Sequence, residues 1–241
     1  MDAHPPQPAP ALELDALARR YGRRWALRGV SARVEPGEVV GLIGRNGSGK
    51  TTLLRIVATL VRPTRGDARV WGHDLRRERE EVRTLVALLG HTTGLYEDLT
   101  AEENLRFAAR MRGLDLPPPA LRSMLARVGL AHEHDRRVRT FSAGMRRRLA
   151  LGRLFLSPPR LLLLDEPYAA FDPEGVAMLE RFVHELAEAG GAALIATHDV
   201  PRATRLVDRF IRLEAGRVVA PEAGPAEPPR ARDQRGKVVS L

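Results

Sequence analysis

The feature that most constrains this chain is a glycine-rich turn that lies between a buried apolar segment and a helical pattern. The apolar segment is 39–44, "VVGLIG", and the helical pattern "KTTLLRIVATL" covers 50–60. The turn and the first helical residues fit the pattern GxxxxGK[ST]. They are, in order, Gly44, Arg45, Asn46, Gly47, Ser48, Gly49, Lys50, Thr51 and Thr52. Because glycines let successive backbone N–H groups converge on an anion, the pattern predicts a phosphate-binding loop.

The lysine in this turn is unusual in a chain of this composition. Of the 39 basic Lys and Arg residues, only Lys50 and Lys237 are lysines. A compact ammonium with three donors can reach phosphates from inside a tight backbone wrap, whereas a planar guanidinium is wider. We therefore expect Lys50 to contact the terminal phosphates of a ligand. The alternative interpretation is a glycine-rich turn with an incidental lysine.

A pair of acids ends the second buried apolar segment, "RLLLLDEP". Its four leucines predict a strand buried on both faces, and Asp165 and Glu166 follow at the carboxyl end, where ligands of parallel sheets bind. We expect Asp165 to hold Mg²⁺ through water, with Thr51 as a direct hydroxyl ligand. Glu166 is then placed to act as general base on an attacking water. Alone, the pair is also compatible with a solvated strand end.

Apolar runs and helical patterns alternate along the chain, which predicts a mainly parallel sheet with helices on its faces. The expected strands are 12–21, 26–38, 39–44, 67–75, 85–91, 160–165, 192–198 and 208–214. The expected helices are 50–60, 100–113, 118–130, 142–156, 173–190 and 200–207. The helix-only block at about 100–156 predicts a separate helical lobe. Residues 1–11 and 221–241 are rich in Pro, Gly and charge, and we expect both to be disordered tails.

The composition excludes several classes of protein. A net charge of +9 and a pI near 11.0 suit polyanionic ligands or an anionic membrane surface. The basic residues are scattered, however, and no aromatic-interleaved basic stripe predicts nucleic-acid binding. No apolar run reaches the roughly 18 residues that span a bilayer. The absence of cysteine excludes disulfides and thiolate metal sites.

The segment "FSAGMRRRLALGRL" distinguishes between families that contain such a loop. Ser142 is a good N-cap, and Gly144 leaves the helix start open to an anion. Together with the loop and the acid pair, it makes residues 12–220 resemble the ATP-binding subunits of ABC transporters. The signature of that family reads LSGGQ, and Ser142 and Gly144 match the two residues that touch the γ-phosphate across a dimer interface. Met145 replaces the glutamine.

The resemblance implies roles for four further residues. His198 matches the histidine that binds the γ-phosphate and orients the attacking water. Asp172 lies in a segment that matches the loop linking the two sites of a dimer. Tyr21 matches the aromatic residue that stacks on adenine. His91 stands where the family usually has a glutamine that ligates Mg²⁺ and signals to the membrane partner. Each residue also has a simpler interpretation. His198 could be a structural histidine, Asp172 a helix N-cap, Tyr21 an ordinary aromatic of a strand, and His91 a residue that only packs at the lobe junction.

The resemblance implies an ABC-type P-loop NTPase fold with a mainly parallel core sheet, an N-terminal antiparallel β part and a helical lobe. It implies ATP and Mg²⁺, a head-to-tail homodimer, separate integral membrane subunits, and a place on the cytoplasmic face of the inner membrane. Three stretches most resemble the ATP-binding subunits of haem exporters of cytochrome c maturation. They are "LLGHTTGLYEDLTAEENLRFAARM", "FSAGMRRRLALGRLFLSPPRLLLLDEP" and "AAFDPEGV". The alternatives are another small exporter, for drugs, lipids or polysaccharide, and a soluble ABC ATPase acting on DNA or ribosomes.

Overall fold

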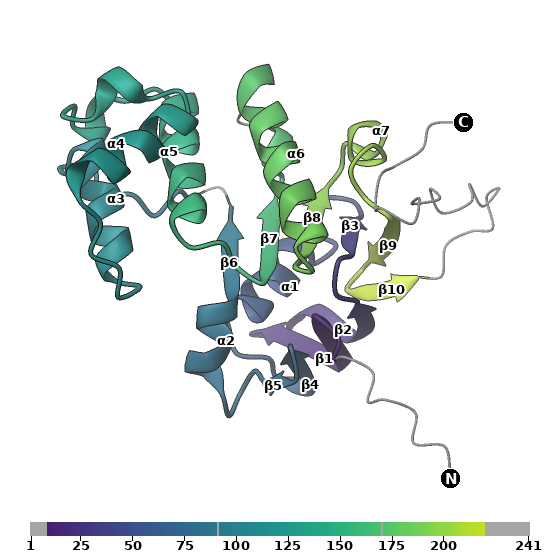
Figure 1. Ribbon diagram of the computed structural model, residues 1–241. Helices are drawn as coiled ribbons and strands as arrows, with labels where there is room; N and C mark the ends of the chain where they lie inside the picture. The colour runs from purple at the N-terminus through teal and green to yellow at the C-terminus, as the bar shows by residue number, and fades with distance from the viewer. Residues whose placement is uncertain (1–8, 91, 170, 220–241) are drawn as a thin grey trace, which may run out of the picture.

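The computed structural model describes residues 9–90, 92–169 and 171–219, which form two sheets with helices packed on them (Figure 1). The smaller sheet is antiparallel, in the order β2-β1-β4-β5. Its strands are β1 (Leu12–Tyr21), β2 (Arg24–Val34), β4 (Arg65–Val70) and β5 (His73–Asp74). The larger sheet has the order β10-β9-β3-β8-β7-β6 and is parallel except for β10. Its strands are β3 (Val39–Ile43), β6 (Val86–Leu89), β7 (Leu161–Asp165), β8 (Ala192–Thr197), β9 (Arg209–Glu214) and β10 (Arg217–Val219).

The helices separate into those that cover the sheets and those that form a lobe. The α-helices are α1 (Lys50–Val57), α2 (Arg79–Leu85), α3 (Ala101–Arg110), α4 (Pro118–Arg127), α5 (Ala143–Leu156), α6 (Pro173–Glu188) and α7 (Val200–Ala203). In Figure 1, α3, α4 and α5 gather to one side of the parallel strands, beyond β6. The expected mixed fold with a parallel core, an antiparallel β part and a helical lobe is confirmed.

Successive residues of the buried strands point to opposite faces of the larger sheet and join two different cores. Leu161 and Leu163 of β7 pack with α1 and the smaller sheet, so that α1 lies between the two sheets. Leu162 and Leu164 pack in the other core, with α6 and the helical lobe. Because both faces are covered, β7 carries leucine at four consecutive positions instead of alternating with polar residues.

The helical lobe shares its core with one face of the sheet. Leu105 of α3, Leu121 of α4 and Leu149 of α5 are fully buried, in the same cluster as Leu162 of the sheet and Phe182 of α6. Burial of one leucine side chain contributes about 2 kcal/mol. The lobe is therefore a lateral extension of the domain, packed on it through α5, rather than a separately cored unit.

Local structure differs from the sequence-based expectation at several points. The single strand expected at 67–75 is interrupted at Trp71 and Gly72, which have positive φ and separate β4 from β5. Helix α2 was not expected, because Val82 is its only buried residue and its sequence therefore has no apolar periodicity. Strand β10 is only three residues long, and a hairpin with positive φ at Ala215 and Gly216 holds it against β9. The helix expected at 200–207 ends at Ala203, after which Leu206 bonds to the carbonyl three residues back, as in a tighter turn.

The expected N-terminal boundary differs from the structure by at least one residue. Ala11, which we expected to belong to the N-terminal tail, is fully buried, and its carbonyl accepts from Trp71 N. Ala9 and Pro10 are described but belong to no helix or strand, and residues 1–8 and 221–241 lie outside the described residues. The disorder expected there therefore stays a prediction.

Candidate functional site

The glycine-rich turn is a compact loop between β3 and α1. Gly47 and Gly49 have φ values of 79° and 114°, which side chains rarely adopt. A Cβ on Gly49 would lie 2.6 Å from the carbonyl oxygen of Ala26. Arg45 and Asn46 are exposed, whereas Ser48 is 5% exposed and its Oγ has no hydrogen-bond partner in the described part of the chain. A buried hydroxyl without a partner suits a loop that is completed by a ligand.

We expect Gly49→Ala to lower the free energy of unfolding by about 3 kcal/mol. Roughly 1–2 kcal/mol come from the left-handed backbone and about 1–3 kcal/mol from the clash with Ala26 and Leu27. Gly113→Ala is the matched control, because Gly113 has a φ of 73° but no atom within 4 Å of its Cβ position. It should cost only about 1 kcal/mol. Urea unfolding measures the free energy of unfolding of both variants. Equal losses of stability in the two would contradict the argument that a clash at Gly49 adds to the cost.

Lys50 is the first residue of α1 and is 6% exposed. Its Nζ donates to the carbonyl oxygen of Gly44 at 2.7 Å, across the turn of the loop. It also lies 3.8 Å from Oε1 of Glu166, whose side chain is 15% exposed. The ammonium is thus enclosed by the loop and faces a carboxylate, as expected from its place in the sequence. The N-terminus of α1 adds its positive dipole end to the same point.

Strand β7 delivers the acid pair beside this helix start. Thr51 Oγ1 donates to Asp165 Oδ1 at 3.1 Å, which places a hydroxyl and a carboxylate oxygen together. Hard oxygen donors of this kind fit Mg²⁺, which usually keeps waters and phosphate oxygens as its other ligands. Among the described residues no cluster of three His, Asp or Glu side chains could hold a metal alone. Thr52, the next helical residue, is partly exposed.

Glu166 and His198 form the second pair of the site. Glu166 has a φ of 50°, unusual outside glycine, and its N–H donates to the carbonyl of Ala196 at 2.8 Å. Its Oε2 lies 2.8 Å from Nδ1 of His198, which follows the neighbouring strand β8. The His198 side chain is 68% exposed, so its ring can reach a ligand above the loop. The strained backbone of Glu166 aims the carboxylate at both Lys50 and His198.

The signature residues lie elsewhere in the chain. Ser142 caps α5 by accepting from Met145 N at 3.2 Å, and it is exposed. A Cβ on Gly144 would have only Ser142 Oγ nearby, at 3.9 Å, so the helix start is open. In the described part of the chain no hydrogen bond or ion pair joins Ser142 to the loop or to the acid pair. The structure therefore divides the expected site residues into two groups.

Asp172 caps α6, with Oδ1 accepting from Gly175 N at 3.1 Å, so the simpler reading of this residue holds. Arg148 of α5 donates to the Asp172 carboxylate and, at 3.0 Å, to Glu174 Oε2. The guanidinium of Arg148 holds the pKa of Asp172 below its ordinary value of 3.8. The ion pair joins the helix of the signature to the segment that follows the acid pair. The expected role of Asp172 between two sites stays a prediction.

We expect the Arg148–Asp172 pair to contribute about 1 kcal/mol at neutral pH, because one partner is well exposed. The folded-state pKa of Asp172 is lowered, so this stabilisation is present above pH 3.8 and is lost as the pH falls through the folded value. A double-mutant cycle of Arg148→Ala and Asp172→Asn, followed by urea unfolding at pH 7 and at successively lower pH values below 3.8, measures it. A coupling energy that does not decrease over this acid range would contradict this assignment.

Tyr21 ends β1 near the mouth of the loop. It pairs with Arg24 of β2, whose guanidinium lies 3.6 Å from the Cβ position of Gly47. The Tyr21 ring is 45% exposed, and the guanidinium of Arg19 lies 4.5 Å from its centroid. This position is compatible with stacking on a base, which stays a prediction. His91, expected near Mg²⁺, lies outside the described residues.

Two arginines that support the site were missed in the sequence, because the run "RRR" at 146–148 was taken for a solvated basic surface. Arg148 forms the ion pairs described above. Arg147 is 7% exposed and donates to the carbonyl of Gly90 at 3.0 Å, and burial lowers the pKa of its guanidinium. Gly90 lies beside Asp165, with 3.8 Å between its Cβ position and that of the aspartate. The available signal was the helical register, which turns Arg147 inward.

A strand, a glycine loop, a buried helix-start lysine and acids on a nearby parallel strand define a nucleoside triphosphatase of the P-loop class. The profile of the ABC transporter family matches residues 27–169, more than half of the chain. The chain therefore belongs to the ABC transporter family, as an ATP-binding subunit, and it is an ATPase. None of the helices in the described ranges is long and apolar enough to cross a membrane.

Relatives of two kinds have similar sequence identity to this chain. The cytochrome c biogenesis ATP-binding export protein CcmA of Vibrio cholerae is 40% identical over 202 residues, 84% of this chain and 98% of that protein. The daunorubicin resistance ATP-binding protein DrrA3 of Streptomyces coeruleorubidus is 40% identical over 212 residues, 87% of this chain and 67% of that protein. A solved ATP-binding subunit of an ABC transporter superposes with a TM-score of 0.81 at 34% identity, over 87% of this chain and 88% of that one.

Proposed function

We propose that two copies of this chain bind two ATP molecules head to tail and drive separate membrane subunits of an exporter from the cytoplasmic face of the inner membrane. The observation that carries the proposal is the separation of the site residues. The loop, Asp165, Glu166 and His198 form one connected group, whereas Ser142 caps an exposed helix start with no partner in that group. An exposed helix N-terminus is suited to an anion supplied by another molecule.

In this proposal the loop N–H groups and Lys50 bind the β- and γ-phosphates. Thr51 and Asp165 would hold Mg²⁺, which neutralises phosphate charge when bound. Glu166 accepts the proton of the attacking water, and His198, fixed through its contact with Glu166 Oε2, orients that water and the γ-phosphate. The water oxygen forms the new bond to phosphorus, and ADP leaves with the electrons of the broken bond.

Mixing two inactive variants tests the head-to-tail arrangement. Lys50→Ala removes the loop cation, and Ser142→Arg blocks the helix start of α5. In a mixed dimer, one site combines both changes and the other contains neither. An equal mixture should therefore recover about a quarter of the unaltered activity, measured as phosphate release, because half the dimers are mixed and each has one intact site. A mixture as inactive as its components would contradict the arrangement.

For the cargo we propose haem export for c-type cytochrome biogenesis. The support is the resemblance of "GHTTGLYEDLTAEENL" and "SAGMRRRLAL" to that group, together with the similarity to cytochrome c biogenesis ATP-binding export proteins. The daunorubicin resistance relatives, with 37–40% identity, favour a drug exporter as the second candidate. Isolation of the native membrane complex separates the two. Haem-handling membrane proteins should co-purify, and drug-efflux subunits in their place would overturn the proposal.

A further inference from the structure

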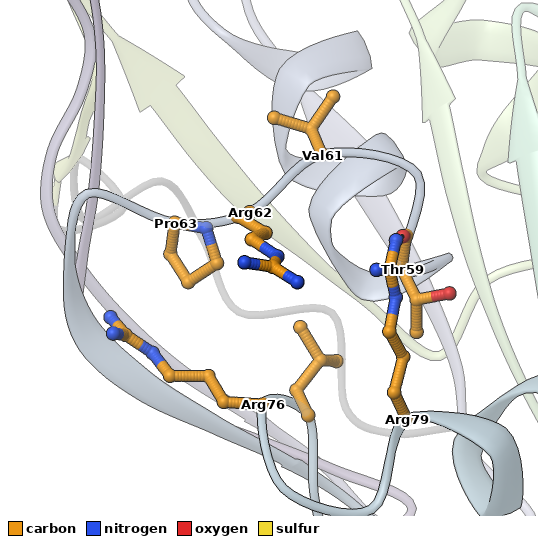
Figure 2. Close-up of a pocket in the computed structure, with 7 residues that line it drawn as sticks. Thr59, Val61, Arg62, Pro63, Arg76 and Arg79 are labelled. Atoms are coloured by element: carbon orange, nitrogen blue, oxygen red, sulfur yellow. Dashed lines mark hydrogen bonds between the residues drawn. The ribbon is translucent and has the colours of Figure 1, made fainter.

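A cavity of about 220 Å³ lies at the opposite end of α1 from the phosphate loop (Figure 2). One wall is the turn that follows α1, and the other is the segment between β5 and α2. Its lining residues are Thr59, Val61, Arg62, Pro63, Leu75, Arg76 and Arg79. Since α1 rises about 1.5 Å per residue, its eight residues place this cavity roughly 12 Å from Lys50. The cavity is therefore distinct from the ATP site.

Three arginines line the cavity without a carboxylate partner. In the described part of the chain, Arg62, Arg76 and Arg79 form no ion pair within 4.0 Å of an acidic oxygen. The nearby Arg83, by contrast, pairs with Glu80 at 2.8 Å. In Figure 2 the Arg62 side chain extends from the upper loop toward the segment that carries the other two arginines. Three unneutralised guanidiniums around one hollow attract an anion.

Two of these guanidiniums are held in place by backbone carbonyls. Arg76 donates to the carbonyl of Gly66 at 2.9 Å, and Arg79 donates to the carbonyl of Thr59. Each guanidinium has five N–H donors, so both keep donors for a ligand. Thr59 itself is 2% exposed with a φ of 60°, and its Oγ1 accepts from Arg83 at 3.0 Å. Part of the cavity wall is therefore a strained, hydrogen-bonded turn, whereas the side chains of Arg62 and Arg76 are exposed.

The rest of the lining limits the kind of ligand. Val61, Pro63 and Leu75 give an apolar surface, and the last two are buried. Typical pockets for small molecules measure about 300–1,000 Å³. This cavity, at about 220 Å³, is smaller than that range and suits only a small ligand. Polymers and flat membrane surfaces do not match a concave site of this size. The combination indicates a small ligand with an anionic group and an apolar part.

We propose that this cavity binds a small molecule that carries a phosphate monoester, with its phosphate on the three guanidiniums and its apolar part against Val61, Pro63 and Leu75. Planar guanidiniums bind phosphate oxygens through paired, charge-assisted hydrogen bonds. The proposal does not rest on the proposed dimer or cargo, since it is argued only from the residues that line this cavity.

Phenyl phosphate is the probe, titrated calorimetrically into the full chain with saturating ADP so that the phosphate loop is filled. The variant Arg62→Gln with Arg76→Gln removes two cavity cations. The variant Arg69→Gln with Arg77→Gln makes the same change of charge on neighbouring exposed positions outside the lining. We expect about tenfold or greater loss of affinity in the first and little change in the second. Unchanged ADP affinity in both shows that the fold is intact.

Three results would overturn the proposal: no binding by the unaltered protein at millimolar probe, unchanged binding by the cavity variant, or equal weakening by both variants. Vesicles of phosphatidic acid, whose headgroup is a phosphate monoester, test a lipid headgroup as the source of the phosphate. Sedimentation with these vesicles that requires Arg62 and Arg76, in a protein that does not bind phenyl phosphate, would also overturn it.

Discussion

Glu166→Gln is expected to bind ATP and to hydrolyse it roughly a thousandfold more slowly than the unaltered protein. A positioned general base contributes about 10²–10⁴ to the rate, and the amide cannot accept the proton of water. Glutamine keeps the shape of the side chain and can still contact His198, whose Nδ1 lies 2.8 Å from Oε2 in the unaltered protein. The loop and Lys50 are untouched, so ATP affinity should change little.

Single-turnover phosphate release and equilibrium binding of a fluorescent ATP analogue measure the two effects separately. Glu185→Gln is the matched control, because Glu185 is an exposed residue of α6 away from the site. If the head-to-tail proposal holds, ATP should also convert the Glu166→Gln protein to a stable dimer in light scattering. Retained hydrolysis would show that Glu166 is not the base. Lost hydrolysis without a dimer would leave the base assignment intact and contradict the dimer.

The sequence predicted the local part of the site well because the chemistry of phosphate binding fixes the backbone there. Only glycine tolerates the φ of 114° at position 49, and only a residue at the start of α1 can reach back to the carbonyl of Gly44, as Lys50 does. The acid pair could be placed at a strand end because four consecutive leucines signal a strand buried on both faces. The family and its fold class followed from these local patterns together with the "FSAGM" segment.

The order of strands and the long-range contacts could not be predicted from local patterns. Strand β8 lies between β3 and β7, and this non-sequential order brings His198 to within 2.8 Å of Glu166. The two arginines of α5 that fix Gly90 and Asp172 have partners 57 and 24 residues away. The helical register indicates that Arg147 points inward, but it does not identify either partner. The cavity beyond α1 depends in the same way on contact between segments that are far apart in the chain.

Lys50→Arg should weaken ATP binding by about tenfold or more and reduce hydrolysis by roughly a hundredfold, although the charge is preserved. The Lys50 side chain is 7% exposed, with its Nζ 2.7 Å from one carbonyl oxygen and 3.8 Å from the Glu166 carboxylate. A planar guanidinium is wider than an ammonium and cannot occupy this enclosure without displacing the loop. Loss of a charge-assisted hydrogen bond to phosphate costs about 1.5–3 kcal/mol, which corresponds to the expected loss of affinity.

Lys237→Arg is the matched control, since it makes the same exchange at the only other lysine of the sequence and should leave binding unchanged. Calorimetric ATP titration and phosphate release measure the two variants, and the thermal midpoint without nucleotide reports the displacement of the loop. If the thermal midpoint falls for Lys50→Arg but not for Lys237→Arg, the guanidinium disturbs the packing of the loop around Gly44. Full activity in Lys50→Arg would mean that positive charge, and not the compact ammonium, is what this loop requires in a chain that uses arginine at nearly every other basic position.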